Sequence, residues 1–80
     1  MILKRKETYK IDTYEVVGCR FKHYKGGLYK VIGEAIHTET EEKLVTYEDM
    51  DGILWARPKE MFFEKIVVDG KEVNRFTKIN

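Results

Sequence analysis

Short segments rich in β-branched and aromatic residues alternate with glycine-containing or polar turns along most of the chain. Runs of this kind, bounded by turn residues, are typical of β-strands. The pattern predicts strands over residues 20–24, 28–37, 44–47, 53–57, 64–68 and 72–76. We expect hairpin turns at Lys25-Gly26-Gly27 and Asp69-Gly70, because glycine tolerates a positive φ. Gly33 lies in the middle of the longest predicted strand, which indicates a bulge or a sharp bend there.

The single proline marks the end of the fourth predicted strand. Pro58 cannot donate to a strand ladder and restricts the residue before it, and the segment PKEMFF permits one helical turn. The predicted fold is therefore all-β, a small, strongly bent barrel or roll of five to six strands with one short helical turn. Residues 18–80 form this single domain. Residues 1–17 are an N-terminal extension, either an added strand through Tyr9, Ile11, Tyr14 and Val16 or a leader with frayed first residues.

The segment LWARP, residues 54–58, combines the only tryptophan of the chain with an arginine. Side chains of a strand alternate between its two faces, so Trp55 and Arg57 share one face. We expect Leu54 and Ala56 to face the core and the Trp–Arg pair to point away from it. The pair has two interpretations. It is a binding platform, or Trp55 is a lid covered by the N-terminal segment while Arg57 pairs with Glu60 or Glu64.

The composition bounds the class of protein. Of the 80 residues, 42% are hydrophobic and 36% are charged, and the formal net charge is +1. This balance argues against wholesale disorder and gives no strong overall field toward nucleic acid or acidic lipid. No apolar run approaches the ~20 residues of a membrane span, and MILKRKETYK lacks the apolar region of a signal peptide. We expect a cytoplasmic protein without membrane association, either a monomer or a weak homodimer.

Several motifs in order along the chain resemble one bacterial family. They are FKHYKGGLYKVIGEAIHTET, VTYE, LWARPKEMF and the final VDGKEV followed by RF. Over about residues 18–76 the chain resembles the bacterial domain of unknown function 1653. The resemblance implies a small SH3-like barrel or roll and no established activity. The matching positions are His23, Lys25, Gly26, Tyr29, His37, Glu39, Tyr47, Trp55, Arg57, Pro58, Met61 and Phe62.

The two histidines are expected on core-facing sides near strand ends, His23 beside Phe21 and His37 beside Ala35. In one interpretation both are partly buried and their ring nitrogens bond to backbone groups. In the other they line a cleft at one mouth of the roll, where their pKa range suits proton transfer or anion recognition. Glu39 likewise either helps to close the polar turn HTET or forms a dyad with His37.

Other catalytic and metal chemistries find little support in the residue types and their spacing. Cys19, His23, His37 and Glu39 are ligand types, but Cys-x3-His followed by His-x-Glu matches no standard zinc spacing. No metal and no other cofactor is predicted. The chain contains no serine, and the lone cysteine has no obvious activating arrangement, so a hydrolase triad is hard to build.

The leading functional hypothesis is a non-catalytic binding module for a nucleotide, a nucleic-acid segment or a peptide. The indole would stack on a flat group, and the guanidinium would pair with an anion. The candidate ligand-binding residues are Trp55, Arg57, His37, His23, Tyr29, Glu39 and Lys25. One alternative is a small enzyme that uses a His/Glu/Arg cluster on an anionic substrate. The other is a structural subunit whose tryptophan is buried against a partner chain.

Overall fold

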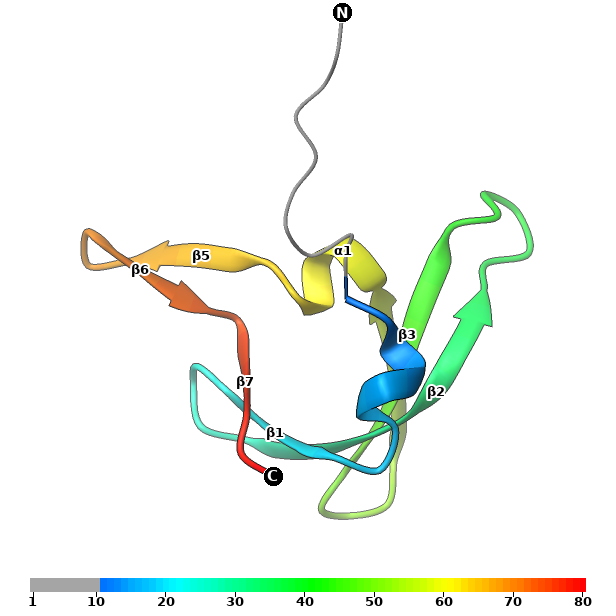
Figure 1. The fold of residues 1–80 in the computed structure, drawn as a ribbon, viewed down its shortest axis with the longest axis horizontal. Coiled ribbons are helices and arrows are strands. Elements are labelled where there is room, and N and C mark those ends of the chain that lie inside the picture. Colours follow the sequence, from blue (N-terminus) through cyan, green and yellow to red (C-terminus); the bar gives the residue numbers. More distant parts are fainter. Residues whose placement is uncertain (1–10) are drawn as a thin grey trace, which may run out of the picture.

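A computed structural model describes residues 11–80, in which a curved antiparallel sheet carries a short helix over its concave side (Figure 1). In chain order the elements are the 3-10 helix η2 (Thr13–Val16), strands β1 (Arg20–His23), β2 (Leu28–Ile36), β3 (Lys43–Asp49) and β4 (Leu54–Pro58), helix α1 (Lys59–Phe62), and strands β5 (Lys65–Val68), β6 (Lys71–Asn74) and β7 (Phe76–Lys78). Five strands form one sheet in the order β4-β3-β2-β1-β7, and β5 pairs with β6 in a separate hairpin. The domain is therefore mostly β, as the sequence predicts.

The strands of the described part do not close into the predicted barrel. β4 and β7 are the two edges of the five-stranded sheet, and they are not paired with each other. The last predicted strand, residues 72–76, is divided at Arg75 into β6 and β7, which belong to different sheets. The Arg75 N–H donates to the Glu64 carbonyl at 3.1 Å, and its carbonyl accepts from the Tyr24 N–H at 2.9 Å. This corner replaces the continuous strand that a closed barrel would need.

The end of the N-terminal extension forms a 3-10 helix in place of the added strand considered for it. Helix η2 begins after Asp12, whose carboxylate accepts from the Tyr14 N–H at 3.0 Å. Such a side-chain cap satisfies a donor that the first turn leaves unpaired. Thr13 is fully buried. Tyr9, another residue of the proposed added strand, lies outside the described residues.

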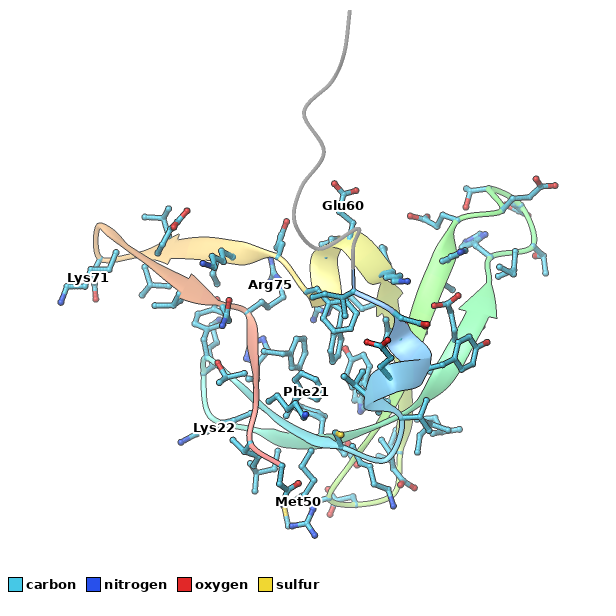
Figure 2. The ribbon with its side chains drawn as sticks, viewed as in Figure 1. Phe21, Lys22, Met50, Glu60, Lys71 and Arg75 are labelled. Atoms are coloured by element: carbon cyan, nitrogen blue, oxygen red, sulfur yellow. The ribbon has the colours of Figure 1, made fainter. Side chains whose placement is uncertain are left out.

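An aromatic cluster fills the concave side of the sheet (Figure 2). Phe62 of α1 stacks on Phe76 of β7 with ring centroids 4.1 Å apart and an interplanar angle of 10°. Phe21 of β1 meets Phe62 edge to face at 5.4 Å. The buried hydrophobic residues of this core are Phe21, Val31, Val45, Tyr47, Phe62 and Phe76. Helix α1 thus supplies the side chain that closes the core, and aromatic burial is its main stabilising contribution.

The bulge predicted at Gly33 is confirmed. Val31 pairs with Tyr47, and Gly33 pairs with Thr46, so Ile32 is the extra residue of β2. A bulge shifts the alternation of side chains beyond it. The inner face consequently receives Glu34, whose carboxylate lies 3.5 Å from the Lys59 ammonium. One end of the inner face is aromatic, and the other end carries an ion pair.

Candidate functional site

The pairing of β3 with β4 places Trp55 and Arg57 on the inner face of the sheet. Trp55 lies opposite Tyr47, and Arg57 lies opposite Val45. Residues directly opposite each other in an antiparallel pair share a face. Tyr47 and Val45 are core residues, whereas the leucine and the alanine of LWARP are exposed. The face assignment made from the sequence was therefore wrong. Because β4 is an edge strand, its inner side chains lie at the border of the core, where large side chains with polar tips fit.

Trp55 is half exposed, and a hydrogen bond fixes the orientation of its ring. Its relative exposure is 50%. The indole Nε1–H donates to Oδ2 of Asp49 at 2.9 Å. The other carboxylate oxygen accepts from the N–H groups of Asp51 and Ile53, which orders the β3–β4 turn. The bond from the indole and then those from the backbone hold the pKa of Asp49 below its ordinary value. Trp55 is thus an accessible aromatic surface held in one orientation.

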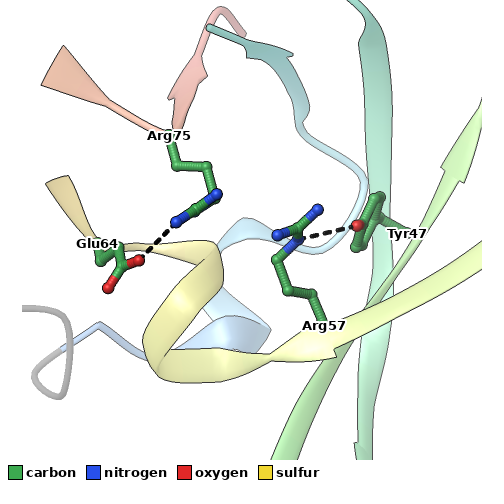
Figure 3. Close-up of polar contacts among 4 residues, drawn as sticks. All are labelled: Tyr47, Arg57, Glu64 and Arg75. Atoms are coloured by element: carbon green, nitrogen blue, oxygen red, sulfur yellow. Dashed lines mark hydrogen bonds and ion pairs between the residues drawn. The ribbon is translucent and has the colours of Figure 1, made fainter. Parts of the chain in front are cut away.

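Arg57 is partly buried and is bonded through only one of its three nitrogens. Its Nε–H donates to the Tyr47 hydroxyl at 3.3 Å (Figure 3). The guanidinium carbon lies 5.7 Å from the centre of the Phe76 ring. The two terminal nitrogens make no hydrogen bond or ion pair with residues 11–80. Glu64, one of the two glutamates expected beside Arg57, pairs with Arg75 instead. The planar fork of Arg57 is therefore oriented, and its two terminal nitrogens have no partner within the described part of the chain.

His23 ends β1 beside the same aromatic residues. Its ring centroid lies 4.9 Å from that of Phe76, and its Nδ1 accepts from the Lys25 N–H at 3.1 Å. Burial first, and then the positive charges of Arg57, Arg75 and Lys25, lower the pKa of His23 below its ordinary value. The imidazole is consequently neutral at pH 7 and carries its proton on Nε2, which is a hydrogen-bond donor.

Tyr29 completes the aromatic end of the inner face. Its ring meets those of Tyr47 and Phe76 edge to face, with centroids 5.4 and 5.7 Å away. A Cβ on Gly27 would come within 2.8 Å of the Tyr29 hydroxyl, so glycine is what lets the ring approach the β1–β2 turn. An open groove of ≈ 420 Å³ lies beside Tyr29, between this turn and the β3–β4 turn.

The structure gathers most of the predicted residues at this end of the sheet. We define the inner site as the side chains of His23, Tyr29, Trp55 and Arg57 over a floor formed by Tyr47 and Phe76. Lys25 lies at its border, with its ammonium 5.8 Å from the centre of the Tyr24 ring. Five of the seven candidates are therefore near one another.

His37 and Glu39 lie at the other end of β2. The Nδ1 of His37 accepts from the N–H groups of Glu39 at 3.1 Å and Thr40 at 3.4 Å, so the imidazole caps the β2–β3 turn. The nine residues of β2 separate this turn from His23, and a strand rises about 3.3 Å per residue. Both histidines bond to backbone groups, as one interpretation predicted. The histidine, glutamate and arginine side chains required by the enzyme hypothesis do not converge.

Neither a group of metal-ligand side chains nor a membrane-spanning helix is found in the described residues. Among residues 11–80, no three His, Cys, Asp or Glu side chains gather in an arrangement that could hold a metal ion. Cys19 is a free thiol packed against the core. Within the same part of the chain, no helix is long and apolar enough to cross a bilayer.

Three residues around the inner site were not among the candidates drawn from the sequence. Tyr47 and Phe76 form its floor, and Arg75 contributes charge close to His23. The first two are aromatic residues of strands, which packing alone explains in most small domains. Arg75 follows a hairpin, and only the corner between β6 and β7 turns it toward the site. Residues 72–76 were predicted as one continuous strand, so the sequence pattern did not mark this corner.

The fold and the inner site together define a small, mostly β domain with an aromatic and cationic inner face. The family model described as "Protein of unknown function (DUF1653)" matches residues 19–78. The chain belongs to this family, as its motifs predict. Comparisons with curated proteins and with solved structures found no match.

Proposed function

We propose that the domain is a non-catalytic binding module whose inner site takes an anionic group attached to a flat ring, as in a nucleotide or a nucleic-acid segment. The observation that carries this proposal is the fork of Arg57 beside the fixed, half-exposed indole of Trp55. Among residues 11–80 nothing bonds to the two terminal nitrogens of this fork. Their Cα atoms are two residues apart on one strand, which corresponds to about 6.6 Å. One ligand can therefore touch both side chains.

The guanidinium supplies the anion contact. Arg57 is held at Nε by Tyr47 and lies over the edge of the core at Phe76, so little further ordering is needed when an anion arrives. Its two free nitrogens present donors in the planar geometry that suits bidentate recognition of phosphate or carboxylate. No carboxylate of residues 11–80 neutralises this charge.

The indole supplies the stacking contact. The hydrogen bond to Asp49 fixes the ring, and half of the side chain remains accessible. Base–aromatic stacking contributes about 1–3 kcal/mol per base. A flat group stacked on Trp55 would place its attached anion toward Arg57, and Tyr29 and His23 border the same face. A nucleotide combines these two chemical features, whereas a peptide carboxylate supplies only the anion.

A direct test uses the fluorescence of Trp55, which is the only tryptophan of the chain. The native protein would be titrated with a short single-stranded oligonucleotide and with adenosine 5′-monophosphate at several salt concentrations. We expect saturable quenching, and affinity that falls as salt rises. Quenching by an acidic peptide but not by either nucleotide probe would overturn the nucleotide assignment.

Variants with a calorimetric readout complete the test. Trp55→Ala should weaken oligonucleotide binding by roughly 5- to 150-fold, which corresponds to one stacking contact. Arg57→Met should weaken it and reduce the salt dependence. Lys22→Ala is the matched control, because Lys22 pairs with Leu28 and Thr77 and lies on the exposed side of β1. Affinity that is independent of salt, or a Trp55→Ala variant that binds as the native protein does, would refute the proposal.

A further inference from the structure

Arg75 brings a second guanidinium toward the inner site. Its Nη2 donates to Oε2 of Glu64 at 2.7 Å. Its Nε is buried and finds no hydrogen-bond partner among the residues that the structure describes. A buried donor without a partner is costly and calls for an explanation. In the view of Figure 3 the Arg75 guanidinium lies between Glu64, to which it donates, and the Arg57 guanidinium.

The two arginines form an unusual arrangement for like charges. In the view of Figure 3 each is held from the outer side, Arg75 by Glu64 and Arg57 by Tyr47, and the two guanidinium groups lie between these partners. No carboxylate of residues 11–80 bridges them. An anion between them would convert a repulsion into two charge-assisted contacts. The same anion would give the buried Nε of Arg75 an acceptor.

His23 adds a third donor from a different element. Its ring lies against Phe76, the residue that follows Arg75 and over which Arg57 is placed. Burial first, and then the charges of the two guanidinium groups, lower the pKa of the imidazole. The neutral ring accepts from the backbone at Nδ1 and leaves Nε2–H to donate. Three donors thus come from β1, β4 and the corner before β7.

We propose that Arg57, Arg75 and His23 together contact the terminal phosphate of a nucleoside phosphomonoester, either a free nucleotide or the phosphorylated end of a strand. The inference rests on the proposed function and specifies which part of the ligand each residue contacts. A monoester phosphate carries three terminal oxygens and a charge of about −1.5 to −2 at pH 7. Donors supplied by three different elements suit the three terminal oxygens of this group better than they suit the two oxygens of a carboxylate. An internal phosphodiester has only one negative charge and two terminal oxygens to offer.

Calorimetric titration with four probes tests this assignment on the full chain. The probes are inorganic phosphate, adenosine 5′-monophosphate, adenosine, and the diester adenylyl-adenosine. We expect the monophosphate to bind about tenfold or more tightly than the diester or adenosine, and phosphate to compete with it. An oligonucleotide with and without a 5′-phosphate distinguishes a strand end from a free nucleotide as the source.

Substitutions assign the contacts. Arg75→Met should weaken binding of the monophosphate about tenfold and leave the weaker binding of adenosine unchanged. Lys71→Met is the matched control. Lys71 lies at the far tip of the β5–β6 hairpin (Figure 2), and its substitution removes one positive charge, as Arg75→Met does. Arg75→Lys keeps the charge and loses the fork, so intermediate binding is expected. This variant also provides a test if Arg75→Met does not fold.

The failure of this inference differs from that of the proposed function. Equal binding of the monophosphate and the diester, with no effect of Arg75→Met, would overturn the phosphate contact and leave stacking on Trp55 intact. A different result is that phosphate competes with adenosine 5′-monophosphate and binds as tightly as the monophosphate does. It would support the phosphate contact and refute the stacking contact with Trp55. Absence of binding for all four probes would overturn both.

Discussion

Removal of the Glu64 carboxylate should tighten anion binding and weaken the fold at the same time. Glu64→Gln keeps the size of the side chain and deletes the negative charge that partly neutralises Arg75. In the native protein Arg75 is tied to Oε2 of Glu64 at 2.7 Å, and both side chains are about four-fifths buried, with 18% and 21% of their surface accessible. The variant therefore leaves a cation at the site without its partner, which favours an incoming anion and disfavours the folded state.

The magnitudes follow from the geometry. One hydrogen bond on each side of the Arg75 guanidinium places a bound phosphate about 8 Å from the Glu64 carboxylate. A dianion at that distance is repelled by about 1 kcal/mol at the dielectric constant of water, and salt reduces this value. The affinity for adenosine 5′-monophosphate should rise about two- to fivefold at low ionic strength. Loss of a partly buried charged contact should lower the free energy of unfolding by about 1–3 kcal/mol.

The assay combines Trp55 fluorescence titration at 20 and 150 mM NaCl with urea unfolding of the same samples. Glu72→Gln is the control, because Glu72 is exposed on β6 opposite Val67 and its replacement makes the same change in net charge. A folded Glu64→Gln protein that binds the monophosphate no more tightly than the native protein would refute the role given to Arg75. An equal gain in Glu72→Gln would show that net charge, rather than local geometry, sets the affinity.

Three further predictions concern the fold. Phe62→Ala should lower the free energy of unfolding by about 3–5 kcal/mol in urea titration, because the ring is fully buried, whereas the 39% exposed Met61 should tolerate alanine at much smaller cost. The pKa of His23 is lowered in the fold, so below about pH 6.5 the unfolded chain binds more protons than the folded one. The free energy of unfolding should therefore fall as the pH falls through this range. His23→Gln should make this dependence on pH less steep. Gly70→Ala should lower the free energy of unfolding by about 1–2 kcal/mol, measured by thermal unfolding, because φ at Gly70 is +78°. Gly33→Ala should cost less. The φ of Gly33 is not positive, and an added Cβ would lie 3.7 Å from its nearest neighbour. The first expectation would be contradicted if Met61→Ala lowered the free energy of unfolding more than Phe62→Ala. The second would be contradicted if His23→Gln left the pH dependence of stability unchanged, and the third if the two glycine variants had equal effects.

The parts of the fold that local chemistry determines were predicted well from the sequence. The Asp69-Gly70 turn has positive φ at both residues, 52° and 78°, as a two-residue hairpin of this type requires. The bulge at Gly33 and the helical turn after Pro58 also occur where the residue types indicated. Pro58 itself ends β4 as its last residue, which an edge strand permits because its outer N–H side is unpaired.

The parts that depend on long-range pairing could not be predicted in this way. Alternation shows that Trp55 and Arg57 share a face, but only the register with Tyr47 and Val45 identifies that face as the inner one. Arg75 was missed for the same reason, because the corner that directs it depends on backbone contacts with Glu64 and Tyr24. Local sequence thus identified the tryptophan and one arginine of the site. Tertiary structure added the second arginine and separated His37 from His23.

The isolated pairing of β5 with β6 links hairpin opening to site occupancy. A two-stranded hairpin alone is only marginally stable in water, and this one shares no ladder with the larger sheet. The backbone contact between Glu64 and Arg75 and the ion pair of their side chains join its base. Any opening that separates these residues also removes a guanidinium from the inner site. If a phosphate binds Arg75 as proposed, it should slow hydrogen exchange of the hairpin amides. Their exchange rates would then report binding at a distance from the ligand itself.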